Sequence, residues 1–192
     1  MTSNPYRSVI SIYLNSRGFA FVRFKRLVTA RDWNIVDWSI VEARGDKREQ
    51  IVTRVESWFA SFAQNQPHTV VLQDTSHTGT HRPHRIRHLN QAIAKLAQRY
   101  RLPTAFVSRS EVRRHFSYLG NITKDSIAAA IAEHIQDFKR LRVLPPPRKP
   151  WQSEDARMGI FDAAALALTF FYKDARDSSD ELGRVLINPR RS

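Results

Sequence analysis

Cysteine is absent from this chain of 192 residues, and its absence removes several classes of chemistry. Disulfides, thiolate nucleophiles and cysteine-based zinc or iron–sulfur sites are all excluded. The sequence also has no glycine-rich phosphate loop and no Ser/His/Asp nucleophile motif. Its longest apolar run, residues 163–172, is far too short to span a bilayer, and the N-terminus lacks the apolar core of a secretory signal. We therefore expect a cytoplasmic protein without a membrane segment.

Acidic residues are also scarce, above all near the N-terminus, where the first carboxylate is Asp32. Lys and Arg number 31 against 18 Asp and Glu, so the formal net charge is +13. Because these charges are not confined to one tail, they favour a polyanionic partner, nucleic acid before an anionic membrane surface. A hydrophobic fraction of 42%, with 11 Phe and 4 Trp, is ample for a packed core. The chain is thus expected to be globular.

The N-terminal stretch from Val9 to Phe24 has the pattern of a β-hairpin. Two β-rich runs flank Asn15-Ser16-Arg17-Gly18, which places Asn and Gly where turn chemistry requires them. Apolar residues dominate both faces of the first run, as is typical of a central strand that is covered on both sides. Residues 34–43 are again β-rich, and they predict a third antiparallel strand.

The rest of the chain alternates between helical and extended patterns. A change from an antiparallel meander to strand–helix–strand implies a mixed sheet. We expect one domain over residues 1–172 and a polar C-terminal tail over residues 173–192. Helices are expected over residues 46–65, 86–100, 111–116, 123–138 and 154–172, strands over 69–72 and 104–107, and a stiff proline-rich loop over 144–150. Ser110 and Thr123 are the expected N-caps of the third and fourth helices.

This order of elements resembles the α/β ribonuclease-H-like fold, a mixed five-stranded sheet of three antiparallel strands plus two parallel ones, flanked by helices. Within it, three segments resemble RuvC-type Holliday-junction resolvases. Residues 12–21 are similar to the first-strand motif, in which an Asp precedes a Ser-Arg and Gly-aromatic turn. Residues 111–124 are similar to a valine-and-lysine helix, a Gly-Asn turn and the next helix. Residues 159–167, Gly-Ile-Phe-Asp-Ala-Ala-Ala-Leu-Ala, resemble the last-helix pattern Asp-Ala-Ala-Asp-Ala-Leu-Ala.

The resemblance implies a nuclease that cuts branched DNA with two divalent ions, Mg or Mn, held by about four carboxylates. Hard oxygen ligands must converge because one metal activates water while the other stabilises the leaving oxygen. Carried over by position, the metal ligands and catalytic residues here are Asp74, at the end of the fourth strand, and Asp162 in the last helix. The first Asp of the last-helix pattern is Gly159 in this chain.

The acid of the first-strand motif is also missing. Depending on how the shortened turn is aligned, its position falls on Tyr13, Asn15 or Ser11. Asp155 is the replacement we consider as a third catalytic carboxylate. It precedes Asp162 by two turns on the same helix face, about 10 Å along the axis, so it reaches the site only if the helix end bends inward.

Both acids have simpler interpretations as well. Asp74 at a strand end is equally explained by a turn cap or a nearby Arg. Asp162 lies between Phe161 and Ala163, and an unpaired buried carboxylate costs several kcal/mol. It therefore needs a partner, either a metal or an Arg. Two carboxylates within about 5 Å would imply a cation, whereas an Arg between them would imply a retired site.

Basic residues near the resembling segments are the candidate nucleic-acid contacts. The loop before the second helix is rich in His at spacings of four, three and four, but Gly79 and Pro83 break that geometry. A zinc site, a plain surface loop and a phosphate-contacting loop all remain open for these histidines, and Trp151 remains a candidate for stacking on a base. The histidines are His77, His81, His84 and His88, and the candidate contacts are Arg17, Arg82, Arg85, Arg87, Arg113, Arg114 and Lys124.

Three functions follow from these observations. The first is a nucleic-acid-binding, RuvC-like domain that recognises structured or branched DNA, with a degenerate or rebuilt metal site; the resemblance adds a possible homodimer. The second is an active Mg- or Mn-dependent endonuclease of the junction-resolvase type. The third is a basic assembly or interaction protein without a nucleic-acid substrate.

Overall fold

The structure is a computed structural model that describes residues 8–16, 18–26, 33–42, 48–63, 68–76, 83–120, 122–140, 143–146 and 153–177. Predictions that concern Arg17, His77, His81, Arg82 and Trp151 lie outside the described residues. No helix among the described residues has the length and apolar character needed to cross a membrane.

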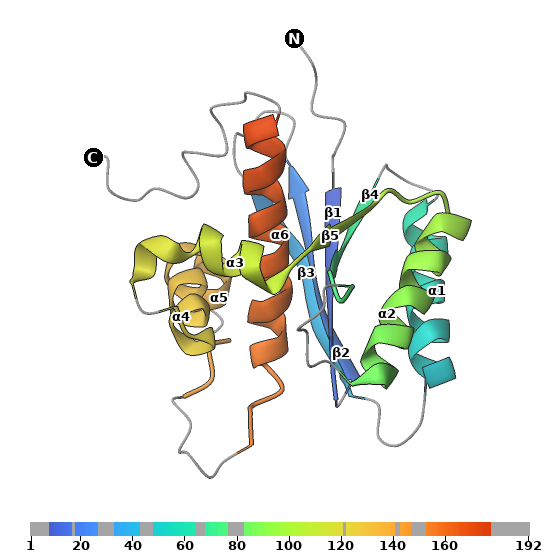
Figure 1. The fold of residues 1–192 in the computed structure, drawn as a ribbon, viewed down its shortest axis with the longest axis horizontal. Helices are drawn as coiled ribbons and strands as arrows, with labels where there is room; N and C mark the ends of the chain where they lie inside the picture. Colours follow the sequence, from blue (N-terminus) through green and yellow to red (C-terminus); the bar gives the residue numbers. More distant parts are fainter. Residues whose placement is uncertain are drawn as a thin grey trace.

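A single five-stranded sheet forms the centre of the described structure (Figure 1). Its strands are β1 (Ser8–Asn15), β2 (Gly18–Arg26), β3 (Trp33–Glu42), β4 (His68–Gln73) and β5 (Thr104–Val107). The order across the sheet is β3-β2-β1-β4-β5. Pairing is antiparallel among the first three strands, and β4 runs parallel to both β1 and β5. The predicted hairpin, the central position of β1 and the mixed sheet are confirmed.

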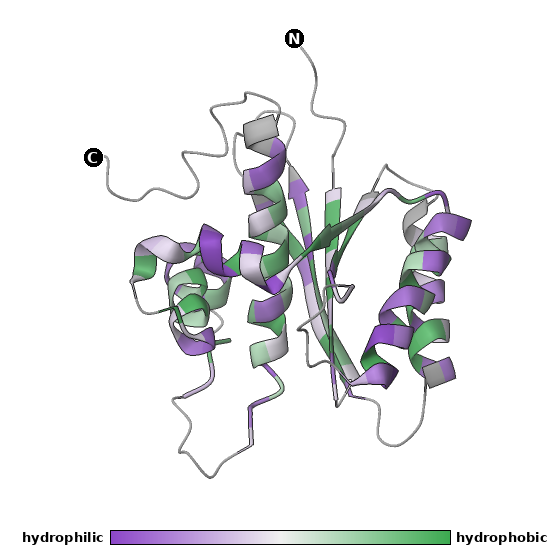
Figure 2. Cartoon of the chain, in the orientation of Figure 1, coloured by the Kyte–Doolittle hydropathy of each residue, from purple (hydrophilic) through white to green (hydrophobic). Residues whose placement is uncertain are grey.

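Helices cover both faces of this sheet. Figure 1 shows α1 and α2 on one face, and α6 with the small helices α3, α4 and α5 on the other. Figure 2 shows hydrophilic and hydrophobic residues alternating along α1 and α2, as expected for helices with one face on a sheet. The helices are α1 (Arg48–Ala63), α2 (His84–Arg99), α3 (Arg109–His115), the 3₁₀ turn η1 (Ser117–Leu119), α4 (Lys124–His134), α5 (Gln136–Arg140) and α6 (Met158–Asp177).

Alternation along the central strand creates two separate cores. Ile10 and Ile12 pack with the apolar residues of α1 and α2, whereas Val9 and Tyr13 face α6. The same alternation in β4 directs Leu72 toward α2 and Val71 toward α6. Because β1 is buried on both faces, polar side chains near its carboxyl end are held rigidly between two helical layers.

Several helix boundaries differ from the sequence predictions, most clearly in α3, α4 and α6. Helix α3 is capped by Ser108, whose side chain forms a capping box with Glu111, and not by Ser110. The helix predicted from Thr123 is interrupted because Ile135 is extended, which separates α4 from α5. Helix α6 begins at Met158 and ends at Asp177, later at both ends than predicted. Its start is delayed because the Asp155 carboxylate accepts from the Arg157 backbone N–H at 2.9 Å, which forms a turn before the helix.

Candidate functional site

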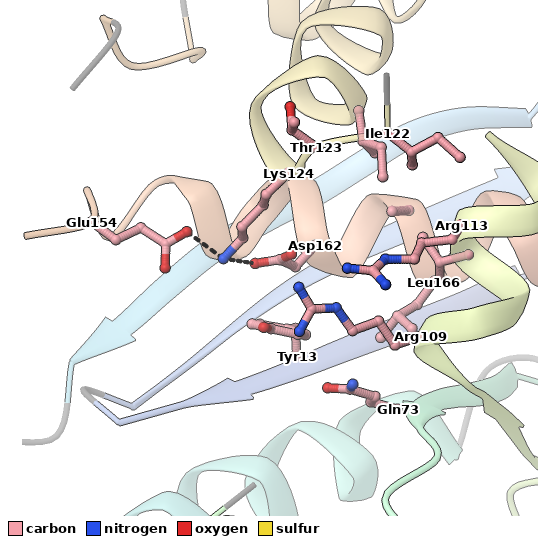
Figure 3. A pocket seen from close by; sticks show the side chains of 13 residues that line it. Tyr13, Gln73, Arg109, Arg113, Ile122, Thr123, Lys124, Glu154, Asp162 and Leu166 are labelled. Atoms are coloured by element: carbon pink, nitrogen blue, oxygen red, sulfur yellow. Dashed lines mark ion pairs between the residues drawn. The ribbon is translucent and has the colours of Figure 1, made fainter. Parts of the chain in front are cut away.

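A pocket of about 540 Å³ lies at the carboxyl ends of the parallel strands β1 and β4, against α3, α4 and α6. Polar side chains from four of these elements point into it (Figure 3). In open α/β folds, ligands bind at the carboxyl ends of the parallel strands. The lining residues are Tyr13, Gln73, Arg109, Val112, Arg113, Ile122, Thr123, Lys124, Ile127, Glu154, Asp162, Ala165 and Leu166.

Lys124 is at the centre of the charge arrangement in this pocket (Figure 3). It is the first residue of α4, directly after Thr123, whose side chain caps the helix as the sequence predicts. Its Nζ lies 2.6 Å from Asp162 Oδ2 and also forms an ion pair with Glu154. The same ammonium lies 5.5 Å from the centroid of the Tyr13 ring. One cation therefore contacts two carboxylates and an aromatic ring.

These partners keep Lys124 charged. Burial alone lowers the pKa of an amine, but Asp162, Tyr13 and Glu154 together raise the pKa of Lys124 above its ordinary value. Asp162 is largely buried, with 18% of its side chain exposed, and the lysine supplies the positive partner that the sequence requires for it. That partner was expected to be a metal or an arginine, so its identity is a correction.

Gln73, and not Asp74, is the residue of β4 that faces this pocket. The strand continues to Gln73, and the alternation that directs Val71 toward α6 directs Gln73 the same way. Asp74 lines a different pocket, where its Oδ1 accepts from the Ser76 N–H at 2.8 Å and from the Ser76 hydroxyl at 2.6 Å. The structure therefore does not bring Asp74 and Asp162 together in one pocket.

Asp155 is also outside the lining of this pocket. Its carboxylate receives two hydrogen bonds from the Arg157 guanidinium, at 2.8 and 3.0 Å, in addition to the bond from the Arg157 backbone. The carboxylate that lines the pocket is Glu154. On a continuous helix it would lie off the face that Asp155 shares with Asp162. It reaches Lys124 because residues 153–157 precede α6 and are not helical.

Gly159 shows why an acid is missing from the start of α6. A Cβ at this position would lie 3.0 Å from the Cβ of Ala20 and 3.4 Å from the Asn15 amide nitrogen. The helix therefore packs directly on the β1–β2 hairpin, and any side chain would force the two apart. This is the position at which the resemblance leads one to expect an acid.

The residues of the pocket do not fit a pair of divalent cations. The position of the first-strand acid falls on Tyr13, Asn15 or Ser11, and the first acid of the last-helix pattern falls on Gly159. Asp74 lines a different pocket, with the neutral Gln73 in this one, and Asp162 is paired with Lys124. An ammonium at 2.6 Å from the carboxylate would repel a second cation from the same oxygens. Across the described ranges, no group of three or more His, Cys, Asp or Glu side chains is arranged to hold a metal ion.

Two arginines of α3 complete the pocket. Arg109 and Arg113 are one helical turn apart, and both guanidinium groups extend into the cavity (Figure 3). Arg113 was among the predicted contacts, while Arg109 was missed, although its i, i+4 spacing to Arg113 was a usable signal. Arg114 is exposed and does not line the pocket.

A partly buried ion pair joins helix α3 to α6. Lys173 Nζ donates to Glu111 Oε1 at 2.5 Å, and Glu111 Oε2 accepts from the Ser108 N–H at 2.7 Å and its hydroxyl at 2.8 Å. Burial by itself raises the pKa of Glu111, but the bonds from Lys173 and Ser108 outweigh it and lower that pKa to about 2. The pair positions the helix that carries both pocket arginines.

The remaining predicted contacts lie on α2. Arg85 and Arg87 are exposed, and Arg87 lines the pocket that contains Asp74. His84 and His88 also line it, with their ring centroids 3.9 Å apart. Two rings in direct contact with each other, and with no third metal-ligating side chain grouped with them among the described residues, favour a contact surface over zinc.

The arrangement of sheet, helices and pocket defines a ribonuclease-H-like fold of the RuvC type. Two solved structures of Thermus thermophilus RuvC are similar to the chain. One has a TM-score of 0.61 at 14% identity, and the other, in complex with a Holliday-junction substrate, has 0.59 at 14%. In both, the match covers 90% of this chain and 97% of the other.

The fowlpox virus Holliday-junction resolvase is a further similar structure, with a TM-score of 0.53 at 12% identity. The match covers 86% of this chain and 98% of the other. No protein-family model matches the sequence, and no curated protein matches it. The chain is therefore a divergent representative of the RuvC-like fold, and the fold expected from the resemblance is confirmed.

Proposed function

We propose that this protein binds structured or branched DNA through the pocket at the ends of β1 and β4, and that Lys124 has taken the place of the metal ions. The observation that carries the proposal is the Lys124 ammonium 2.6 Å from Asp162 and paired with Glu154. A built-in cation of this kind neutralises the carboxylates but does not activate water as a metal does. The protein then recognises DNA without cutting it.

The charges of the pocket support a phosphate ligand. Arg109, Arg113 and Lys124 line it against two carboxylates, Asp162 and Glu154, both of which are already paired with the lysine. The two guanidinium groups are thus the cations available to a backbone phosphate, and Arg offers it paired donors. The net charge of +13 adds long-range attraction for a polyanion.

The comparison with solved structures supports the class of ligand. Thermus thermophilus RuvC is similar in fold and has been solved with a Holliday-junction substrate. The similarity of fold extends over 90% of this chain. Branched DNA is therefore our proposed ligand, and a homodimer, which would place two such pockets on one junction, is part of the proposal.

Binding by variants of single arginines tests this function. We expect fluorescence anisotropy to show salt-sensitive binding to a four-way junction, with weaker binding to duplex DNA and to RNA. Arg109→Gln and Arg113→Gln should each weaken binding roughly 5- to 20-fold and lower the salt slope by about 1. Arg54→Gln, which removes an exposed charge from α1, is the matched control and should leave binding nearly unchanged.

Other outcomes identify the competing functions. Cleavage of the junction with Mg or Mn, abolished by Asp162→Asn, would establish a metal-dependent endonuclease and overturn the role of Lys124. Binding to DNA that is no stronger than binding to bovine serum albumin at low salt would indicate a basic assembly protein. Sedimentation of the protein with and without the junction tests the homodimer, and a monomer in both would contradict it.

A further inference from the structure

A second pocket, of about 740 Å³, lies on the opposite side of the carboxyl end of β4, between that strand, β5 and α2. Asp74 lines it, while the preceding residue, Gln73, lines the pocket with Lys124. The two pockets therefore flank one strand end. The lining residues are Asp74, Thr75, Ser76, His84, Arg87, His88, Asn90, Gln91, Ala94 and Phe106.

Phe106 is the unusual residue of this second pocket. It lies on β5, the edge strand of the sheet, and 46% of it is exposed. Its partner in the register is Leu72, which is fully buried under α2, yet Phe106 belongs to neither hydrophobic core. An aromatic ring left open at the wall of a polar pocket offers a flat surface for stacking.

The polar side of the same pocket carries one arginine and two histidines beside one acid. Arg87 and the neighbouring rings of His84 and His88 line it from α2. Asp74 is the acid in the lining, and its Oδ1 is engaged by the Ser76 N–H and hydroxyl. Asn90 donates to the Gln73 carbonyl at 2.8 Å, which holds α2 against the end of β4. This combination matches a single nucleotide, whose flat base can stack on the aromatic ring while its phosphate accepts from the donors.

We propose that the second pocket holds one unpaired nucleotide of the bound nucleic acid, with its base stacked on Phe106 and its phosphate contacted by Arg87 and the histidine pair. This inference rests on the proposed function, because the bound DNA strand would extend from the phosphate contacts at Arg109 and Arg113 to the second pocket. The end of β4 lies between the two pockets. The base that lies there is read by stacking, which is tolerant of sequence.

Two DNA probes of equal length test this proposal with the full chain. One is a fully paired duplex, and the other carries a single unpaired 2-aminopurine, whose fluorescence falls when the base stacks on an aromatic ring. We expect tighter binding to the second probe and quenching on binding. Phe106→Ala should abolish the quenching and weaken binding to that probe roughly 5- to 100-fold, with little change for the duplex.

Matched variants separate stacking from general surface effects. Phe106→Tyr should retain both affinity and quenching, and Phe106→Leu should lose the quenching. Val36→Ala removes an exposed apolar side chain from β3, the opposite edge of the sheet, and should behave as the parent. Arg87→Gln should weaken binding of the unpaired probe more than binding of the duplex.

The failure of this proposal is distinct from the failure of the proposed function. If the parent protein binds the four-way junction but Phe106→Ala has unchanged affinity and quenching, the second pocket is not a nucleotide site. If the parent binds neither probe nor the junction, the proposed function itself fails. Equal binding of the two probes by the parent would also overturn the inference.

Discussion

The two pockets at the end of β4 differ in how their charges are used. In the first, the acids Asp162 and Glu154 are matched by Lys124 from a different helix. In the second, Asp74 is held locally by Ser76, and an exposed aromatic ring faces basic side chains. The comparison shows that the two faces of one strand end can carry different chemistry, because each face depends on a separate helical layer.

Restoring the missing acid is the sharpest way to break the first pocket. Gly159→Asp should lower the free energy of unfolding by about 3 kcal/mol, since its Cβ would meet Ala20 at 3.0 Å and its charge would enter a tightly packed contact. Urea denaturation measures the loss. Ala129→Asp, at an exposed site on α4, is the control and should cost much less. A Gly159→Asp protein as stable as the parent would contradict the close packing of α6 on the hairpin.

Removing the internal cation tests the same pocket with a smaller effect. Lys124→Gln leaves Asp162 and Glu154 facing each other, and the free energy of unfolding should fall by about 1 to 2 kcal/mol at pH 7, a value reduced because Glu154 is 44% exposed. Addition of Mg²⁺ should recover part of this loss in the variant and none in the parent.

Two controls accompany the Lys124→Gln measurement. Lys124→Arg keeps the positive charge and should lose less stability than Lys124→Gln. A variant as stable as the parent at pH 7, in the absence of any divalent cation, would show that the lysine does not neutralise these carboxylates.

The attachment of α3 has the smallest expected effect. The pKa of Glu111 is lowered to about 2 from an ordinary value of 4.5, so its contribution to stability is complete above about pH 4.5 and is lost as pH falls toward 2. Glu111→Gln should lower the free energy of unfolding by about 1 kcal/mol at pH 7 and reduce the acid dependence between those values. Denaturation at pH 7 and pH 3 measures both. Glu133→Gln, an exposed acid on α4, should leave the acid dependence unchanged.

The pattern of the sequence was sufficient for most of the elements. Alternation and turn chemistry predicted the hairpin, and apolar residues on both faces of β1 predicted its central position, because both signals depend on neighbours in the chain. The cap at Thr123 was predicted for the same reason. Local signals were less reliable at the starts of α3 and α6. Ser108, and not Ser110, caps α3, and Asp155 forms a turn with Arg157 before α6 begins.

The candidate site was predicted only in part. Arg113, Lys124 and Asp162 were selected individually and do line one pocket. Asp74 was selected because the resemblance places an acid at the end of the fourth strand, whereas the alternation along β4 directs Gln73 toward α6. A shift of one residue moves a side chain to the other side of the sheet.

The sequence by itself determined the order of strands and helices, the basic charge and the lack of an acid in the first strand, since each depends on residue types and their spacing. Only the tertiary structure decided that Lys124 meets Asp162 and Glu154, and that Gly159 fits against Ala20 and Asn15. Those contacts join segments far apart in the chain. Their distances follow from how α4 and α6 pack on the sheet, and no local pattern encodes that packing.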